Sequence, residues 1–204
     1  MASPTRRLIL ATAAASALLA ACDRPGGGDK PRFQGVDITG ADFGQQLALH
    51  DGDGKLYTLA DFKGKVVVLF FGYTQCPDVC PTTLLELAEV RKLLGADGQR
   101  VQGVFVSLDP ERDTPEVLKA YVASFGADFI GLRGSEEETR AAAKEFKIFY
   151  SKVPGKTENS YTVDHTAGSY VLDAQGRIRL LERYAIGADK LAADLKILLA
   201  EGAS

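Results

Sequence analysis

The chain contains three cysteines and two histidines, and two of the cysteines lie close together. Cys76 and Cys80 are in residues 71–81, a stretch that follows an apolar run and precedes a run with helical spacing. Two thiols at this separation can close a disulfide, bind a soft metal ion, or simply fill space in a core. The spacing leaves these alternatives open, so other parts of the chain have to decide between them.

Two prolines restrict the backbone around this cysteine pair. Pro77 and Pro81 disfavour a helical conformation at the residues that precede them, Cys76 and Cys80. We therefore expect Cys76 to lie in a loop and Cys80 at the start of a helix that begins near Pro81. The positive end of the helix dipole at that position favours thiolate over thiol.

The two histidines differ in their surroundings. His50 lies in a predicted hairpin turn and is interpreted as a solvated residue. His165 follows a polar segment and directly precedes a predicted strand. A single histidine in such a place is more often structural than functional. It becomes a candidate ligand only if the fold brings it beside the cysteines.

The pattern of apolar residues predicts the elements that must position these side chains. A hairpin is expected over residues 46–59, around an Asp-Gly turn. Strands are predicted over 66–71, 101–108, 129–132, 166–172 and 177–184, and helices over 81–95, 114–125, 135–146 and 189–199. The polar residues 147–161 are predicted to form a long exposed loop. This order indicates an α/β sandwich around a mixed sheet, with functional sites at the carboxyl ends of its strands.

The composition is that of one ordinary globular domain. The chain has 204 residues, of which 46% are apolar and 25% are charged. Its net charge of -3 gives no basic surface for nucleic acid, so we expect no nucleic-acid partner.

Residues 1–21 have the features of an export signal. Arg6 and Arg7 precede an apolar stretch that is too short for a comfortable membrane span. The signal ends Leu19-Ala20-Ala21-Cys22, which resembles the lipobox of bacterial lipoproteins and implies that Cys22 is lipidated. Residues 22–32 are then a flexible tether and residues 33–204 the functional domain. We expect the protein to be anchored to the membrane of a bacterial cell envelope and to face the periplasm.

Three motifs in order, residues 71–81, 106–115 and 163–165, resemble the Sco family, known as SenC or PrrC in bacteria. The similarity extends over about residues 36–199. It implies a thioredoxin-like, peroxiredoxin-type three-layer sandwich and a role in copper handling for the CuA centre of cytochrome c oxidase. Matched position by position, the family's copper ligands fall on Cys76, Cys80 and His165. Two thiolates and one imidazole suit Cu(I), and with an exchangeable fourth ligand they also suit Cu(II).

The first functional hypothesis is therefore a membrane-tethered metallochaperone, not an enzyme, whose partner is the oxidase subunit that carries CuA. The alternative is a thiol–disulfide oxidoreductase that uses a redox disulfide of Cys76 and Cys80 to reduce partner cysteines. Thioredoxin-type enzymes typically carry Cys-x-x-Cys, and their relatives place a proline where this chain has Thr166-Ala167-Gly168. Both departures weigh against general reductase activity. A copper or redox sensor is a third hypothesis, for which the sequence has no output domain.

Other motif residues have simpler explanations. Asp78 is interpreted equally well as a carboxylate at a helix start or as a contact for a partner. Asp164 is a candidate to orient His165, although neighbouring side chains on a strand point apart. Residues 109–115 are assigned to a capping turn without catalysis. The predicted loop 147–161 is expected to let the imidazole approach or leave the cysteines.

Overall fold

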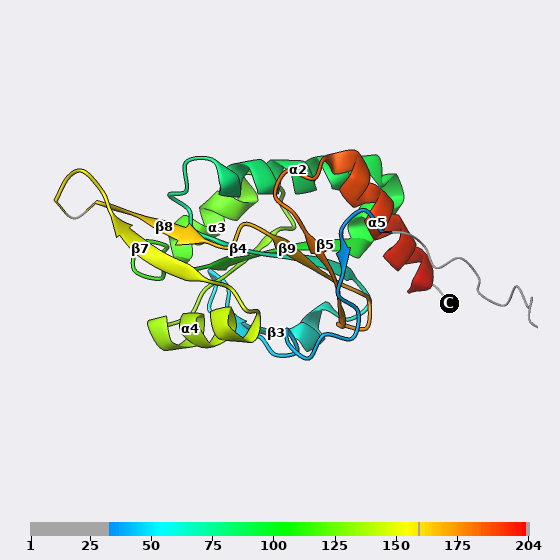
Figure 1. Cartoon of the computed structure of the whole chain (residues 1–204), viewed down its shortest axis with the longest axis horizontal. Helices are drawn as coiled ribbons and strands as arrows, with labels where there is room; N and C mark the ends of the chain where they lie inside the picture. Colours follow the sequence, from blue (N-terminus) through cyan, green and yellow to red (C-terminus); the bar gives the residue numbers. More distant parts are fainter. Residues whose placement is uncertain (1–32, 159, 203–204) are drawn as a thin grey trace, which may run out of the picture. The chain divides into compact units, whose positions relative to one another are not determined.

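A six-stranded mixed sheet forms the centre of the protein, and the computed structural model describes residues 33–158 and 160–202 (Figure 1). The strand order is β1-β10-β9-β4-β5-β6, with β4, β5 and β6 parallel and the other neighbouring pairs antiparallel. The strands are β1 (Val36–Asp37), β4 (Val66–Gly72), β5 (Val101–Ser107), β6 (Ile130–Leu132), β9 (Ser169–Leu172) and β10 (Ile178–Glu182). The predicted mixed sheet is confirmed.

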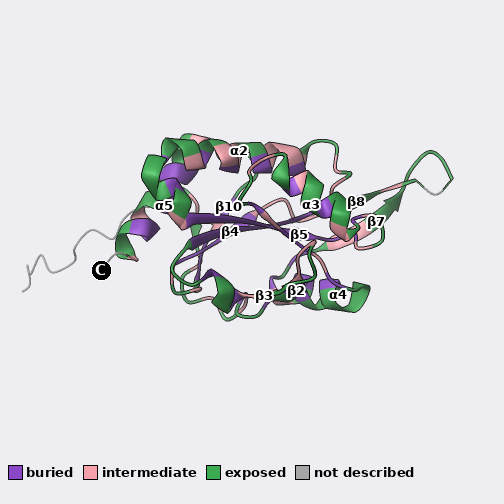
Figure 2. Cartoon of the chain, turned by 180° about the vertical axis from the view of Figure 1, so that it is seen from behind, coloured by how far each residue is buried: buried purple, intermediate pink, exposed green. Residues whose placement is uncertain are grey.

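Helices cover both faces of this sheet, as Figures 1 and 2 show. One face carries α2 (Val79–Leu93), α3 (Pro115–Ala123) and α5 (Ala188–Glu201). The other carries α4 (Glu136–Glu145), the hairpin of β2 (Ala48–His50) and β3 (Leu56–Thr58), and the 3-10 helix η2 (Leu59–Phe62). A second 3-10 helix, η3 (Gly95–Arg100), leads into β5. None of the helices in the described residues is long and apolar enough to cross a bilayer.

The central strands β4 and β5 are buried along their whole length. Parallel strands covered by helices on both faces lose the alternation of polar and apolar residues, which explains the continuous apolar run that precedes the cysteines. Phe70, Phe71 and Phe105 are at most 2% exposed. Each such aromatic side chain contributes roughly 1.5–3 kcal/mol by its burial. The cysteine segment therefore emerges from a strand that is buried along its whole length.

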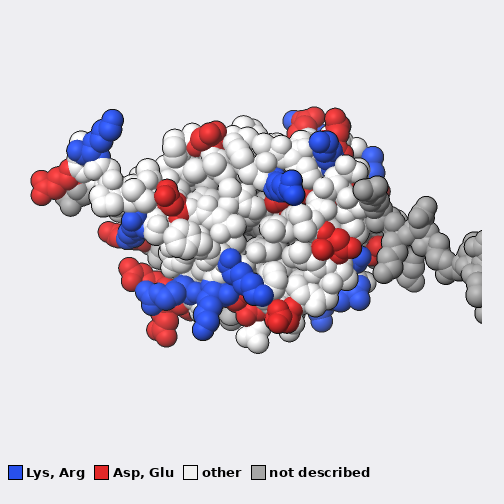
Figure 3. Space-filling view, viewed as in Figure 1, with Lys and Arg blue, Asp and Glu red and all other residues white. Residues whose placement is uncertain are grey.

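Charged side chains of both signs are interspersed on the face shown in Figure 3. Surface ion pairs include Lys147 with Asp42, at 3.4 Å, and Lys119 with Asp53, at 2.6 Å. Ion pairs between side chains this exposed contribute little to stability.

Residues 147–161 differ from the predicted loop. They contain β7 (Tyr150–Pro154), which pairs antiparallel with β8 (Tyr161–His165) from Tyr150↔His165 to Pro154↔Tyr161. This two-stranded ribbon, hairpin β7–β8, projects from the left of the sheet in Figure 1. The loop prediction was wrong because β7 is exposed at its distal end, where Lys152, Val153 and Pro154 all face solvent, so no alternating apolar pattern marks the strand.

The starts of one helix and one strand also differ from the predicted positions. Helix α2 begins at Val79 and not near Pro81, so Cys80 lies inside its first turn. A proline is tolerated there because the amide hydrogen it lacks would have no partner within the helix. Strand β9 begins at Ser169, three residues later than Thr166. The β2–β3 hairpin and the Thr114 cap of α3 are confirmed, since Val117 N donates to Thr114 Oγ1 at 3.3 Å.

Candidate metal centre

The two cysteines lie where β4 gives way to α2, in a segment that we call the cysteine loop (residues 73–78) and in the first helical turn after it. Cys76 N donates to Tyr73 O at 3.2 Å, and Cys80 N donates to Cys76 Sγ at 3.4 Å. Cys76 is half-buried, whereas Cys80 is fully buried. Gly72 leaves room for the second thiol, because a Cβ at that position would lie 2.6 Å from Cys80 Sγ. Both thiols are free in the structure.

His165 reaches this pair from the end of β8, eighty-five residues beyond Cys80. Its Nε2 lies 3.7 Å from Cys80 Sγ. The ligand atoms of Cys76, Cys80 and His165 all lie within 4.8 Å of one another. The fold thus brings together the three residues that the sequence analysis named, and they are the only such cluster of metal-ligating side chains in the described residues.

The orientation of the imidazole is set by its backbone neighbour. His165 Nδ1 lies 2.9 Å from Thr166 O, and a carbonyl oxygen only accepts hydrogen bonds, so Nδ1 carries the proton and donates it there. This leaves the Nε2 lone pair directed at the sulfurs. The rings of Phe70 and Tyr73 pack against the imidazole at centroid distances of 6.1 Å each. The ring is held in one tautomer and one position.

The two thiols have opposite pKa shifts. The hydrogen bond from Cys80, together with backbone N–H groups at the start of α2, lowers the pKa of Cys76 to about 5. The same hydrogen bond to Cys76, and then burial, raises the pKa of Cys80 above its ordinary range. At neutral pH the pair is therefore a Cys76 thiolate that accepts a hydrogen bond from a Cys80 thiol. A soft, half-exposed sulfur anion beside a free imidazole nitrogen is suited to a thiophilic metal ion.

The other residues that the sequence singled out do not belong to the cluster of three ligands. His50 is in β2, where its backbone pairs with that of Arg133, outside the cluster. Asp164 is exposed, and Thr166 O takes the role of orienting His165. Asp78 occupies the N-cap position of α2 without a side-chain capping bond. Cys22, the predicted lipidation site, lies outside the described residues.

Sequence reasoning missed the residues that join the two halves of this site. Arg112 and Asp113, assigned above only to a capping turn, contact the cysteine loop, and Arg112 also contacts hairpin β7–β8. In the sequence, both residues belong to the second of the three family-like motifs, residues 106–115. Nothing local in that motif indicates which distant segments it contacts.

Comparisons with known proteins agree with this geometry. The SCO1/SenC family model matches residues 36–200. A SCO2-like protein of Rickettsia felis is 37% identical over 135 residues, which are 66% of this chain and 66% of that protein. The structure of Bradyrhizobium japonicum ScoI with copper bound is 41% identical and covers 77% of this chain and 99% of its own, with a TM-score of 0.71.

A more distant structure shares the fold. BsSco, described as a member of the Sco family of cytochrome c oxidase assembly proteins with a disulfide switch, is 24% identical, covers 81% of this chain and 98% of its own, and has a TM-score of 0.61.

The mixed sheet between two helical layers, with a dithiol at the start of its first long helix, defines a protein of the thioredoxin-like fold. Within that class, the match over residues 36–200 assigns the chain to the SCO1/SenC family.

Proposed function

We propose that the protein binds copper through Cys76, Cys80 and His165 and delivers it to, or prepares, the CuA centre of cytochrome c oxidase. The observation that carries the proposal is the convergence of two sulfurs and one imidazole nitrogen within 4.8 Å. The copper-bound ScoI relative and the assembly role stated for BsSco support the metal and the destination.

The donor set suits a carrier of copper as cargo. Thiolate and imidazole ligands favour Cu(I), and a three-residue set leaves a position that a fourth ligand can occupy. A structural zinc site, in contrast, is normally closed by four protein ligands. An acceptor protein can enter through the open position and take the metal by ligand exchange. The half-exposed Cys76 is the ligand that such an acceptor reaches first.

The cellular setting belongs to the same proposal. Lipidation of Cys22 after removal of residues 1–21 would hold the domain on the membrane of a bacterial cell envelope, facing the periplasm. Residues 22–32, which contain three consecutive glycines, supply the tether. An anchored carrier meets a membrane-embedded oxidase in two dimensions. Metabolic labelling with a fatty acid, lost in Cys22→Ser, tests this part.

A copper titration tests the site. The full-length chain with Cys22→Ser, which leaves Cys76 and Cys80 as its only thiols, is titrated with Cu(I) under anaerobic conditions against a chromophoric chelator. His165→Ala is expected to weaken binding by about tenfold or more, whereas His50→Ala, which removes the other histidine, leaves it unchanged. Equal affinity of His165→Ala and the parent chain would show that the three-ligand site is wrong.

A second candidate function follows from the asymmetry of the thiols. With a pKa of about 5, Cys76 is a thiolate that can attack a partner disulfide, forming a mixed disulfide and releasing one partner thiolate. Cys80, on losing its proton, then attacks Cys76 Sγ, releases the second partner sulfur and leaves a Cys76–Cys80 disulfide. Two electrons pass to the partner.

This reaction does not use His165, which distinguishes the two functions. Rates of insulin reduction comparable to those of thioredoxin, unchanged in His165→Ala, would favour the oxidoreductase. Copper binding that depends on His165, with slow insulin reduction, favours the carrier.

A further inference from the structure

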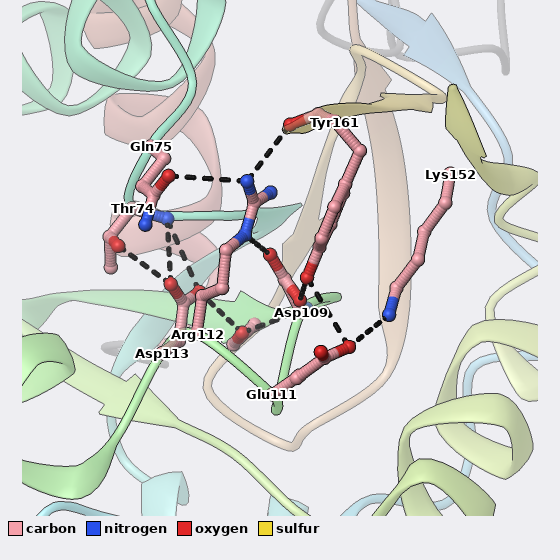
Figure 4. A network of polar contacts seen from close by, with 9 residues as sticks. Thr74, Gln75, Asp109, Glu111, Arg112, Asp113, Lys152 and Tyr161 are labelled. Carbon is pink, nitrogen blue, oxygen red and sulfur yellow. Dashed lines mark hydrogen bonds and ion pairs between the residues drawn. The ribbon is translucent and has the colours of Figure 1, made fainter. Parts of the chain in front are cut away.

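The two halves of the site are held by a third segment, the β5–α3 turn (residues 108–114), which Figure 4 shows from close by. Asp113 is fully buried, and its carboxylate accepts hydrogen bonds from Thr74 N at 3.2 Å, Thr74 Oγ1 at 2.6 Å and Ser107 Oγ at 2.6 Å. The carboxylate thus fixes the cysteine loop to the end of β5.

Arg112, the neighbouring residue, contacts both halves. Its Nη1 donates to Gln75 Oε1 in the cysteine loop at 3.2 Å and to Tyr161 O on β8 at 2.8 Å. Its Nε donates to Asp109, and its guanidinium lies 3.5 Å from the centroid of the Tyr161 ring. The same Tyr161 donates its hydroxyl hydrogen to Asp109 Oδ1 at 2.8 Å. In Figure 4 the guanidinium stands between Gln75 and Tyr161.

Another polar contact between the turn and the hairpin is more exposed. Lys152 Nζ pairs with Glu111 Oε2 at 2.5 Å, but these side chains are 44% and 62% exposed. Arg112 is 18% exposed, and its partner Asp109 is fully buried. Exposed ion pairs contribute little, whereas loss of one member of a buried pair leaves an uncompensated charge.

Position along β8 explains why this contact matters for the metal. Tyr161 and His165 are the two ends of one strand, and a two-stranded ribbon has little stability of its own. The direction of β8 is therefore set by what holds it to the rest of the molecule, namely the buried Val163 in its middle and the polar contacts at its ends. Backbone pairing with β7 runs along the whole of β8, from Tyr150↔His165 to Pro154↔Tyr161, and so does not distinguish its two ends. At the Tyr161 end, Arg112 ties the strand to the cysteine loop.

We propose that Arg112 is a positioning residue of the metal centre, which holds hairpin β7–β8 against the cysteine loop and so sets the distance of His165 from the two sulfurs. The inference rests on the proposed function, since it concerns the same three ligands. This role requires the several N–H groups of a guanidinium. The single ammonium of a lysine at position 112, if paired with Asp109, could not also bridge Gln75 and Tyr161 O.

The test compares copper binding of Arg112→Lys with that of the parent chain, both in the full-length Cys22→Ser background. Arg112→Lys is expected to weaken Cu(I) binding by about tenfold, in the range seen when groups that orient metal ligands are removed. On Cu(II) loading, electron–nuclear double resonance of protein labelled with 15N-histidine should show a weaker imidazole coupling. The rate at which oxidant closes the Cys76–Cys80 disulfide should be unchanged, because those thiols share one loop and helix.

Two further variants guard against a purely structural effect. Gln75→Ala removes only the hydrogen bond of Arg112 with the cysteine loop, and we expect a smaller loss of affinity in the same direction. Lys152→Gln removes the exposed ion pair of β7 with Glu111 and should bind copper as the parent does. Circular dichroism confirms that each variant is folded.

Parent-like affinity and nitrogen coupling in folded Arg112→Lys and Gln75→Ala would overturn the inference. Failure of the proposed function looks different. In that case His165→Ala binds copper as tightly as the parent, whatever residue occupies position 112.

Discussion

The cysteine pair and His165 are held by two regions built in opposite ways. The cysteines follow β4, whose seven residues are all buried, and Cys80 packs into the core. His165 ends a ribbon in which Lys152, Val153 and Pro154 are exposed. The first region owes its geometry to hydrophobic packing along its whole length, whereas the second is anchored by the buried Val163 together with polar contacts such as that of Arg112 with Tyr161 O. Dithiol chemistry is thus a property of the core, whereas metal binding also depends on how the ribbon is held.

Truncation of an aromatic residue in each region gives the largest contrast. Phe71→Ala in β4 removes a side chain with 0% exposure and should lower the free energy of unfolding by about 3–5 kcal/mol. Phe149→Ala, just before β7, removes one that is 68% exposed and should change it by less than about 0.5 kcal/mol. Denaturant titration measures both. Equal losses would contradict the division into a packed and a polar region.

A buried acid weakens the packed region at high pH. Glu182 in β10 is 1% exposed, and burial, followed by the charge of nearby Asp194 and a hydrogen bond with that carboxylate, raises its pKa to about 8. Between its ordinary pKa of 4.5 and about 8, the folded protein keeps a proton that the unfolded chain releases, so stability falls as pH rises. Glu182→Gln should therefore be more stable than wild type by roughly 1–3 kcal/mol at pH 9 and show no such gain at pH 4.

The matched control for this change is Glu137→Gln, an exposed glutamate in the first turn of α4. It should keep the wild-type dependence of unfolding free energy on pH. Parallel pH curves for wild type and Glu182→Gln would show that the buried acid does not titrate as argued.

Removal of Cys80 sharpens the comparison within the site itself. Cys80→Ala deletes the main cause of the lowered pKa of Cys76, so that pKa should rise from about 5 toward its ordinary value. Iodoacetamide labelling of Cys76 at pH 6 should then slow, because less thiolate is present. An unchanged labelling profile in Cys80→Ala would mean that the cysteine loop alone sets the pKa.

The smallest effect is expected at the outer contact of the ribbon. Lys152→Gln breaks an exposed pair with Glu111, which salt already screens. The midpoint of denaturation at physiological ionic strength should not move measurably. A clear loss of stability would show that the ribbon depends on its exposed side as well.

The same contrast explains what the sequence could predict. β4 and β5 were found because a strand buried on both faces is a continuous apolar run. β7 was missed because no buried face marks its register. The predicted start of α2 is two residues too late. A proline disfavours a helical conformation at the residue before it, but it is tolerated in the first helical turn, where Cys80 and Pro81 lie.

The ligand set shows the same limit. Two of its members are neighbours in sequence, but the third is eighty-five residues from Cys80 and was assigned only through a family resemblance. The role of Arg112 is harder still to predict from the sequence, because its contacts with Gln75 and Tyr161 depend on how three separate segments fold together.

The opposite pKa shifts of the two thiols determine how many protons the cysteine pair releases when a metal ion binds. Cys76 is already a thiolate at neutral pH, whereas Cys80 keeps its proton. Each metal ion that binds both sulfurs should therefore release about one proton from the pair to solvent. Acceptance of the metal by a partner would return that proton to Cys80, which makes the reverse step easier as the surroundings become more acidic.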